Sequence, residues 1–157
     1  MTENNFHRIT KGLYLGDNQS AGQVRLLQSH GITHILICGA ELEPKFPEYF
    51  IYKKLNMLDN SDYDLKKDFN EGILFINQVI SSMNNILVYC NKGKSRSPTI
   101  VIGYLMKFHD LRCEYAIDRV KKLHPTTAPI KAFVKFLQKF DQGISRDKCS
   151  SCNCLLF

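Results

Sequence analysis

The chain has 157 residues, a length that suits one domain with one hydrophobic core. Apolar residues make up 44% and charged residues 23%, which is typical of a globular protein and excludes a disordered chain. The formal net charge of +6 favours a polyanionic partner, such as a phosphoprotein, a phosphoinositide, nucleic acid or an acidic membrane face.

The start of the chain, MTENNFHRIT, has no basic residue ahead of an apolar run, so no signal peptide is expected. The longest apolar stretch, residues 100–106, is too short to span a bilayer. We therefore expect a reducing, cytoplasmic setting in which the six cysteines are free thiols.

The first third of the chain predicts short strands around one helix. The sequence GLYLG at 12–16 predicts a strand, and residues 23–30 predict a helix that Gly31 ends in a left-handed conformation. Apolar, β-forming residues predict a buried strand at 33–38 and a further strand at 49–57.

A loop and a long helix follow. The stretch LDNSDYDL, residues 58–65, is rich in turn-forming residues and predicts a loop. From Leu65 to Met83 the apolar residues recur every three or four positions, which predicts an amphipathic helix with Asp64 as its N-cap. Residues 84–90 then predict a buried strand that ends at Cys90.

The last third predicts helices. SPTIVIGYLMKFH, residues 97–109, predicts a buried helix because Ser97 suits a cap, Pro98 suits the first turn and the rest is largely apolar. Further helices are predicted at 114–123 and 130–140. The alternation predicts an α/β fold with a largely parallel central sheet of about five strands flanked by helices.

The loop CNKGKSR, residues 90–96, joins the buried strand to the buried helix, and ligands of such sheets bind beyond the carboxyl ends of strands. Gly93 permits a positive φ, and no acidic residue lies between Cys90 and Arg96. Backbone N–H groups can therefore point inward as a nest for a phosphate and for a thiolate. The predicted phosphate-binding residues are Asn91, Lys92, Gly93, Lys94, Ser95 and Arg96.

This pattern predicts nucleophilic catalysis on a phosphate ester. The Cys90 thiolate attacks phosphorus to form a phosphocysteine, while the planar fork of Arg96 binds two phosphate oxygens. The Ser97 hydroxyl can donate to the departing thiolate, and a general acid must come from elsewhere in the chain. The chemistry requires no metal ion or other cofactor.

Two similar patterns predict nothing of this kind. Cys113 and Arg119 repeat the C-x5-R spacing, but two acidic residues lie between them and the segment fits an amphipathic helix. The sequence GKS at 93–95 resembles the end of a nucleotide-binding loop, but position 88 is Val88 where that motif needs glycine.

These motifs resemble those of the dual-specificity protein phosphatases, a branch of the cysteine-dependent phosphatase superfamily. The resemblance covers residues 6–140 and is most specific over GKSRSPTIVIGYLM, residues 93–106. It implies a catalytic domain, assigned to residues 1–143, that hydrolyses phosphotyrosine and phosphoserine or phosphothreonine in proteins. The family's general acid lies on a loop well before the cysteine, which indicates Asp59 and, as second choice, Asp62.

The sequence departs from the family pattern at Tyr89, where the family usually has a histidine that helps to order the loop. This difference predicts lower activity and leaves open a phosphate-binding module with little turnover. Residues 124–125 and 129–130 are His-Pro and Pro-Ile, where the family usually has Arg-Pro and Pro-Asn.

Lys92 and Lys94 make the loop unusually basic. The tumour-suppressor phosphoinositide 3-phosphatases of the same superfamily are similar in placing two lysines there, so a phosphoinositide at a membrane is an alternative substrate. The lysines could equally be a solvated rim. An RNA 5′-phosphatase is a further alternative, but no other feature favours nucleic acid as a partner.

The tail, residues 144–157, is rich in cysteine. Its last four residues, CLLF, fit the C-a-a-X pattern, and a final Phe favours geranylgeranylation of Cys154. Cys149 and Cys152 are candidates for palmitoylation, which predicts attachment to the cytoplasmic face of a membrane. Alternatives are a tetrapeptide without meaning and metal binding by the three cysteines, for which the spacing offers no second ligand pair. Phosphatases of the regenerating-liver type are similar in ending with a prenylation box.

Overall fold

The computed structural model describes residues 4–144 and contains one five-stranded sheet of order β1-β2-β5-β3-β4. The strands are β1 (Phe6–Thr10), β2 (Leu13–Asp17), β3 (Ile32–Cys38), β4 (Ile51–Leu55) and β5 (Asn85–Cys90). All neighbouring pairs are parallel except β1 with β2. The predicted α/β fold with a largely parallel sheet is confirmed. Strand β1 was not predicted, because it is a partly exposed edge strand with one buried residue and no clear apolar pattern.

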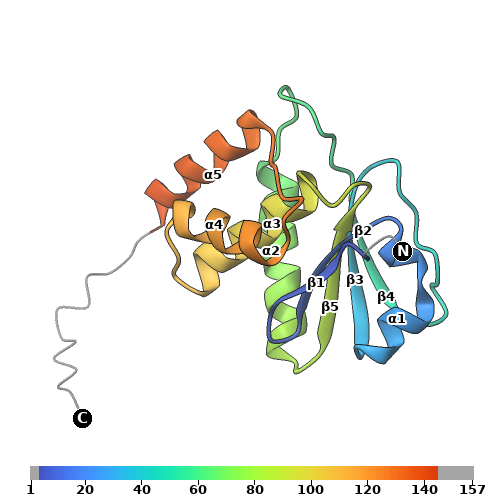
Figure 1. Cartoon of the computed structure of the whole chain (residues 1–157). Helices are drawn as coiled ribbons and strands as arrows, with labels where there is room; N and C mark the ends of the chain where they lie inside the picture. Colours follow the sequence, from blue (N-terminus) through green and yellow to red (C-terminus); the bar gives the residue numbers. More distant parts are fainter. Residues whose placement is uncertain (1–3, 145–157) are drawn as a thin grey trace, which may run out of the picture.

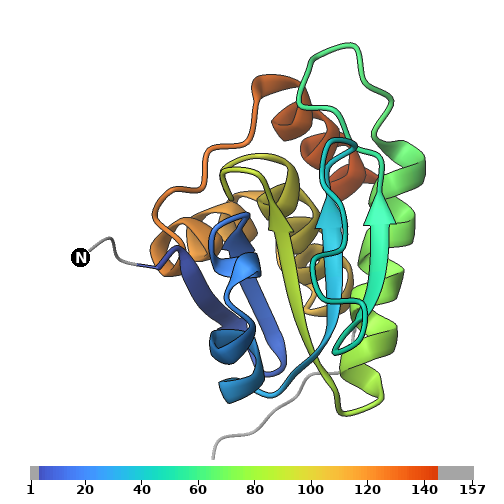
Figure 2. The same ribbon diagram turned by 90° about the vertical axis from the view of Figure 1, so that its right-hand side faces the viewer.

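Helices cover both faces of the sheet (Figures 1 and 2). They are η1 (Ser20–Gly22), α1 (Val24–Ser29), α2 (Lys66–Ser81), α3 (Arg96–Phe108), α4 (Cys113–Leu123) and α5 (Lys131–Gly143). Helices α2 and α3 pack on one face with α4 and α5 outside α3, whereas α1 lies on the other face. None of these helices is both long and apolar enough to cross a membrane.

Helix α3 is the centre of the larger core. Its residues from Arg96 to Met106 are all buried, as its apolar sequence predicts. Helix α2 approaches it closely at Gly103, where an added Cβ would lie 2.2 Å from Cζ of Phe69. The Phe69 ring also packs edge-on against Phe136 and Phe140 of α5, with centroids 4.9 and 4.8 Å away. This packing holds α3, and therefore the loop that precedes it, in one position.

Two predicted helix starts differ in detail from the structure. Ser97 was predicted to cap α3, but the helix begins at Arg96, its cap residue is Ser95, and no side chain caps it. Helix α2 begins at Lys66, whose N–H donates to Oδ1 of Asp64 at 3.1 Å, so Asp64 acts as the predicted capping side chain although the formal cap is Leu65.

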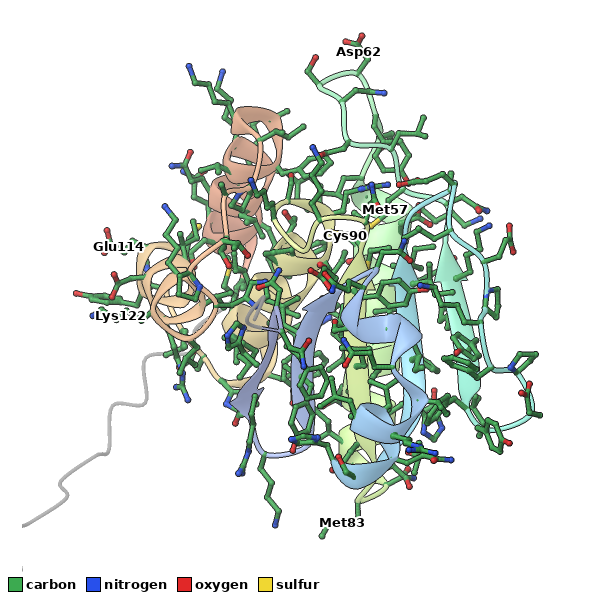
Figure 3. The ribbon with its side chains drawn as sticks, turned by 45° about the vertical axis from the view of Figure 1, so that its right-hand side comes forward. Met57, Asp62, Met83, Cys90, Glu114 and Lys122 are labelled. Atoms are coloured by element: carbon green, nitrogen blue, oxygen red, sulfur yellow. The ribbon has the colours of Figure 1, made fainter. Side chains whose placement is uncertain are left out.

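The parallel strands end at the same edge of the sheet, where the arrowheads of β3, β4 and β5 lie in Figure 2. Cys90 and Met57 lie at this end, and Met83 lies at the opposite end (Figure 3). Ligands of parallel sheets bind at this edge, so the fold places Cys90 where a ligand is expected. The tail cysteines Cys149, Cys152 and Cys154 lie outside the described residues.

Candidate active site at the carboxyl end of the sheet

A pocket of about 290 Å³ opens where β5 leads into α3. Cys90 is the last residue of β5, and Arg96 is the first residue of α3. The lining residues are Asp59, Cys90, Asn91, Lys92, Lys94, Ser95 and Arg96, together with Ala128 and Ile130. The structure therefore brings together the nucleophile, the arginine and the acid that the sequence predicts. Gly93 and Ser97 are buried beside the pocket and do not line it.

The two ends of the loop formed by residues 91–95 are held by backbone groups of other segments. The Asn91 carbonyl accepts a hydrogen bond from the N–H of Asn18 at 3.1 Å. The Lys94 carbonyl accepts one from the N–H of Ala128 at 2.7 Å. The segments after β2 and after α4 therefore fix both ends of loop 91–95.

The two middle carbonyls of loop 91–95 are held by side chains. The Lys92 carbonyl lies 3.4 Å from Nδ2 of Asn5, and the Gly93 carbonyl lies 2.8 Å from Nε2 of His124. Gly93 has a φ of 67°, and a Cβ there would lie 2.8 Å from the carbonyl oxygen of Gly16. Only glycine fits this turn, because both the left-handed backbone and the close approach exclude a side chain.

These outward bonds orient the donors of loop 91–95. In a trans peptide the carbonyl of one residue and the N–H of the next point in opposite directions. Outward carbonyls at residues 91–94 therefore turn the N–H groups of residues 92–95 toward the inside of the loop. Within residues 4–144 these N–H groups donate no hydrogen bond to the protein. The loop thus has the geometry of an anion nest at the N-terminus of a buried helix.

Cys90 and Ser97 are in direct contact. The Ser97 hydroxyl, which is fully buried, donates to Sγ of Cys90 at 3.1 Å. A hydroxyl donor at this distance stabilises negative charge on the sulfur. The Ser97 side chain, inside the first turn of α3, therefore bonds Cys90 and does not cap the helix.

The other described cysteines differ from Cys90 in their surroundings. Cys38 is fully buried at the end of β3, and burial raises its pKa well above the ordinary value. Burial also raises the pKa of Cys113, which lies in α4 as the amphipathic pattern predicts. Both are therefore protonated, unreactive thiols at neutral pH. No group of three His, Cys, Asp or Glu side chains in residues 4–144 is arranged to hold a metal ion.

Arg96 is clamped by Glu41, a residue that the sequence did not indicate. Nη1 and Nη2 of Arg96 donate to the two carboxylate oxygens of Glu41 at 2.8 and 2.6 Å, and Nη1 also donates to the Met57 carbonyl at 3.3 Å. The bond to Glu41 raises the pKa of Arg96, and the bond to Arg96 lowers the pKa of Glu41.

This clamp determines which edge of the guanidinium faces a ligand. Glu41 occupies the edge formed by Nη1 and Nη2. Within the described residues Nε of Arg96 donates no hydrogen bond, so Nε and the second hydrogen of Nη2 remain for two oxygens of an anion. Glu41 comes three residues after the carboxyl end of β3, and that position was the signal by which the sequence could have revealed it.

The three acids of the loop before α2 occupy different places. Asp59 is exposed at the rim and lines the pocket with Cys90 and Arg96. Asp62 lies at the tip of the loop and points away from Cys90 (Figure 3). Asp64 bonds the start of α2. Only Asp59 is therefore placed to exchange a proton with a ligand in the pocket.

Tyr89 belongs to the core on the face of the sheet opposite Cys90. Its side chain is 1% exposed and packs among the residues around α1, and burial raises its pKa. Its hydroxyl has no hydrogen-bond partner within the described residues. Tyr89 therefore gives loop 91–95 no side-chain support, and this support comes from Asn5 and His124.

Comparison with known proteins identifies relatives of this domain. Residues 13–143 match the family profile described as dual specificity phosphatase, catalytic domain. Dual specificity protein phosphatases 1 and 1B of Arabidopsis thaliana are 37% and 38% identical to it over 136 residues, which are 87% of this chain and 69% and 81% of theirs.

Solved structures agree with this comparison. DUSP15 superimposes with a TM-score of 0.84 and 29% identity, over 88% of each chain. The human tyrosine phosphatase-like serine/threonine/tyrosine-interacting protein superimposes with a TM-score of 0.82 and 30% identity, over 87% of this chain and 95% of its own.

The Glu41 clamp predicts the effect of one substitution. Glu41→Gln loses the negative charge and one of the two bonds to Arg96, so the guanidinium is held less firmly. We therefore expect inorganic phosphate to bind about tenfold more weakly in calorimetric titration. Glu43→Gln is the matched control, because Glu43 lies on the same loop but pairs with Lys54 at 2.6 Å. Equal affinity in the two variants would mean that Arg96 does not need Glu41.

Proposed function

The chain belongs to the dual specificity phosphatase family, and we propose that it uses Cys90 to hydrolyse phosphotyrosine and phosphoserine or phosphothreonine in proteins. The observation that carries this proposal is the Cys90 thiol at the N-terminus of α3, in one pocket with Arg96 and Asp59. Two relatives are named as dual specificity protein phosphatases, which supports a protein substrate.

In the first step, the phosphate ester lies in the nest of loop 91–95. The free edge of Arg96 binds two of its oxygens, and the inward N–H groups neutralise the charge that develops on them. The Cys90 thiolate attacks phosphorus as the bond to the leaving oxygen breaks, and a phosphocysteine forms. Asp59 donates a proton to the leaving oxygen.

In the second step, water replaces the leaving group. Asp59, now a carboxylate, accepts a proton from the water as its oxygen attacks phosphorus. The phosphorus–sulfur bond breaks and Cys90 leaves as a thiolate. The Ser97 hydroxyl, 3.1 Å from the sulfur, stabilises that thiolate and so speeds this step.

A second candidate substrate is a phosphoinositide at a membrane. One observation favours it: the exposed side chains of Lys92 and Lys94 line the pocket beside Arg96. Together they supply positive charge for a ligand with more than one phosphate group. A protein substrate remains the first candidate, because it is the class that the names of the relatives indicate.

Attachment to the cytoplasmic face of a membrane through Cys154 is a further proposal, which rests on the sequence of residues 144–157 alone. Cys149 and Cys152 are its proposed palmitoylation sites, since stable attachment needs a second anchor.

The proposed reaction predicts a pattern of substrates and variants. Wild type should release phosphate from phosphotyrosine and phosphothreonine peptides, and Cys90→Ser should lower the rate at least a thousandfold, because a hydroxyl is a poor nucleophile here. Cys113→Ser, which alters the second C-x5-R cysteine, is the control and should keep its activity. Full turnover by Cys90→Ser would refute the mechanism, and peptide binding by wild type without turnover would indicate a binding module.

The same assay separates the two substrate classes. Lys92→Ala with Lys94→Ala should slow the hydrolysis of a phosphoinositide much more than that of a phosphopeptide, if lipid is the substrate. An equal effect on both would argue that the lysines only form a charged rim.

The choice of general acid is tested by the leaving group. Asp59→Ala should lower kcat at least tenfold for a phosphopeptide and much less for an aryl phosphate with an acidic phenol, since that group departs without a proton. Asp62→Ala should change neither rate, because Asp62 lies away from the pocket. The reverse result would assign the role to Asp62.

Lipidation predicts a change in mass and in location. The chain expressed in animal cells should carry a geranylgeranyl group on Cys154 and sediment with membranes. The Cys154→Ser variant should remain in the supernatant. An unmodified Cys154 in mass spectrometry would dismiss the anchor without affecting the catalytic proposal.

A further inference from the structure

His124 is a buried histidine in contact with loop 91–95. It follows the last residue of α4 and is fully buried. Its Nε2 lies 2.8 Å from the Gly93 carbonyl oxygen. A carbonyl can only accept a hydrogen bond, so Nε2 of His124 carries a proton.

The other ring nitrogen of His124 faces a second histidine. Nδ1 of His124 lies 2.7 Å from Nδ1 of His7 on β1, with the two rings nearly perpendicular. Only one hydrogen can lie between two nitrogens at this distance. In neutral His124 the hydrogen is on Nε2, so Nδ1 is bare, and His7 must be the donor.

The alternative, a cationic His124 that donates to both partners, is opposed by its surroundings. The pKa of His124 is lowered to about 4, mainly by burial, and the neighbouring His7 acts in the same direction. The Gly93 carbonyl and the Asp17 carboxylate of β2 act in the opposite direction but do not offset burial. His124 is therefore neutral at pH 7, and the direction of both hydrogen bonds is determined.

We propose that His7 and His124 form a positioning pair for catalysis, in which His7 orients His124 and His124 holds the Gly93 carbonyl outward. Holding this carbonyl turns the N–H of Lys94, on the other side of the same peptide, toward the bound phosphate. The pair would assist the proposed phosphatase reaction, and this proposal rests on that one. Neither histidine lines the pocket, so the pair acts on the bound phosphate only through loop 91–95.

Four hydrogen bonds hold the carbonyls of loop 91–95 outward, and the bond from His124 is the one best suited to position the loop. Two of those bonds come from backbone groups, and the fourth, from Asn5, is 3.4 Å long and exposed. The bond to Gly93 is short and buried, and it acts at the one residue of the loop with a positive φ. Buried bonds of this kind hold their groups in place more strongly than exposed ones.

The tautomers provide a direct test that does not depend on activity. Nitrogen-15 NMR of the imidazole rings at pH 7.5 should show a proton on Nε2 of His124, none on its Nδ1, and a proton on Nδ1 of His7. A proton on Nδ1 of His124 would overturn the proposal, since His7 would then be the acceptor and could not orient the ring as described.

The effect on loop 91–95 is measured by the affinity for inorganic phosphate and by kcat/KM. His124→Leu should lower both about tenfold or more, because the Gly93 carbonyl loses its donor. His124→Gln should recover most of the loss, since its amide nitrogen can replace Nε2. Loss without recovery by Gln, in a protein that melts like wild type, would overturn the proposal.

The role of His7 is isolated by a double-mutant cycle. His7→Ala should weaken phosphate binding severalfold in the wild type and have no further effect when His124 is already Leu. His34→Ala, another half-buried strand histidine, is the control and should leave binding unchanged. Additive effects of the His7 and His124 substitutions would overturn the pairing. Phosphate binding needs no turnover, so these results stand apart from the failure or success of Cys90 as nucleophile.

Discussion

The site depends on one constraint: four successive carbonyls of loop 91–95 are hydrogen-bonded away from the pocket. The partners come from Asn5 before β1, Asn18 after β2, His124 after α4 and Ala128 before α5. Each outward carbonyl turns the next N–H inward. The anion nest is therefore made by segments distant in sequence, and loop 91–95 alone does not determine it.

The arginine depends on the same assembly. Arg96 begins α3, and α3 is fixed by its burial and by the close contact of Gly103 with Phe69. Glu41 then orients the guanidinium from the loop after β3, because it takes the Nη1 and Nη2 edge and leaves the other edge to the pocket. Cys90 and Arg96 thus belong to a buried strand and a buried helix, whereas Asp59 lies on an exposed loop at the rim. This division suits the proposed reaction, since a proposed acid on a loop can meet leaving groups of different size.

Tyr89 stands where the family usually has a histidine that helps to order the loop, and in this protein another residue orders it. A side chain at residue 89 alternates with Cys90 and so faces the opposite side of the sheet, where Tyr89 fills the core. Support for loop 91–95 comes instead from His124, which stands where the family usually has the arginine of its Arg-Pro pair. Two departures that looked unrelated therefore concern the same loop.

Local patterns in the sequence determined much of this protein. Apolar runs predicted the buried strands, the period of the apolar residues predicted α2, and the Ser-Pro start of an apolar run predicted α3. The absence of acids and one glycine distinguished the loop after Cys90 from the segment after Cys113. Glycine, strand end and helix start are properties of adjacent residues, so a sequence displays them. Only the tertiary structure decided that Glu41 orients Arg96, that Asp59 and not Asp62 lies at the pocket, and that His7 meets His124 across 117 positions. Such contacts depend on the order of strands in the sheet and on the packing of helices, which no local pattern specifies.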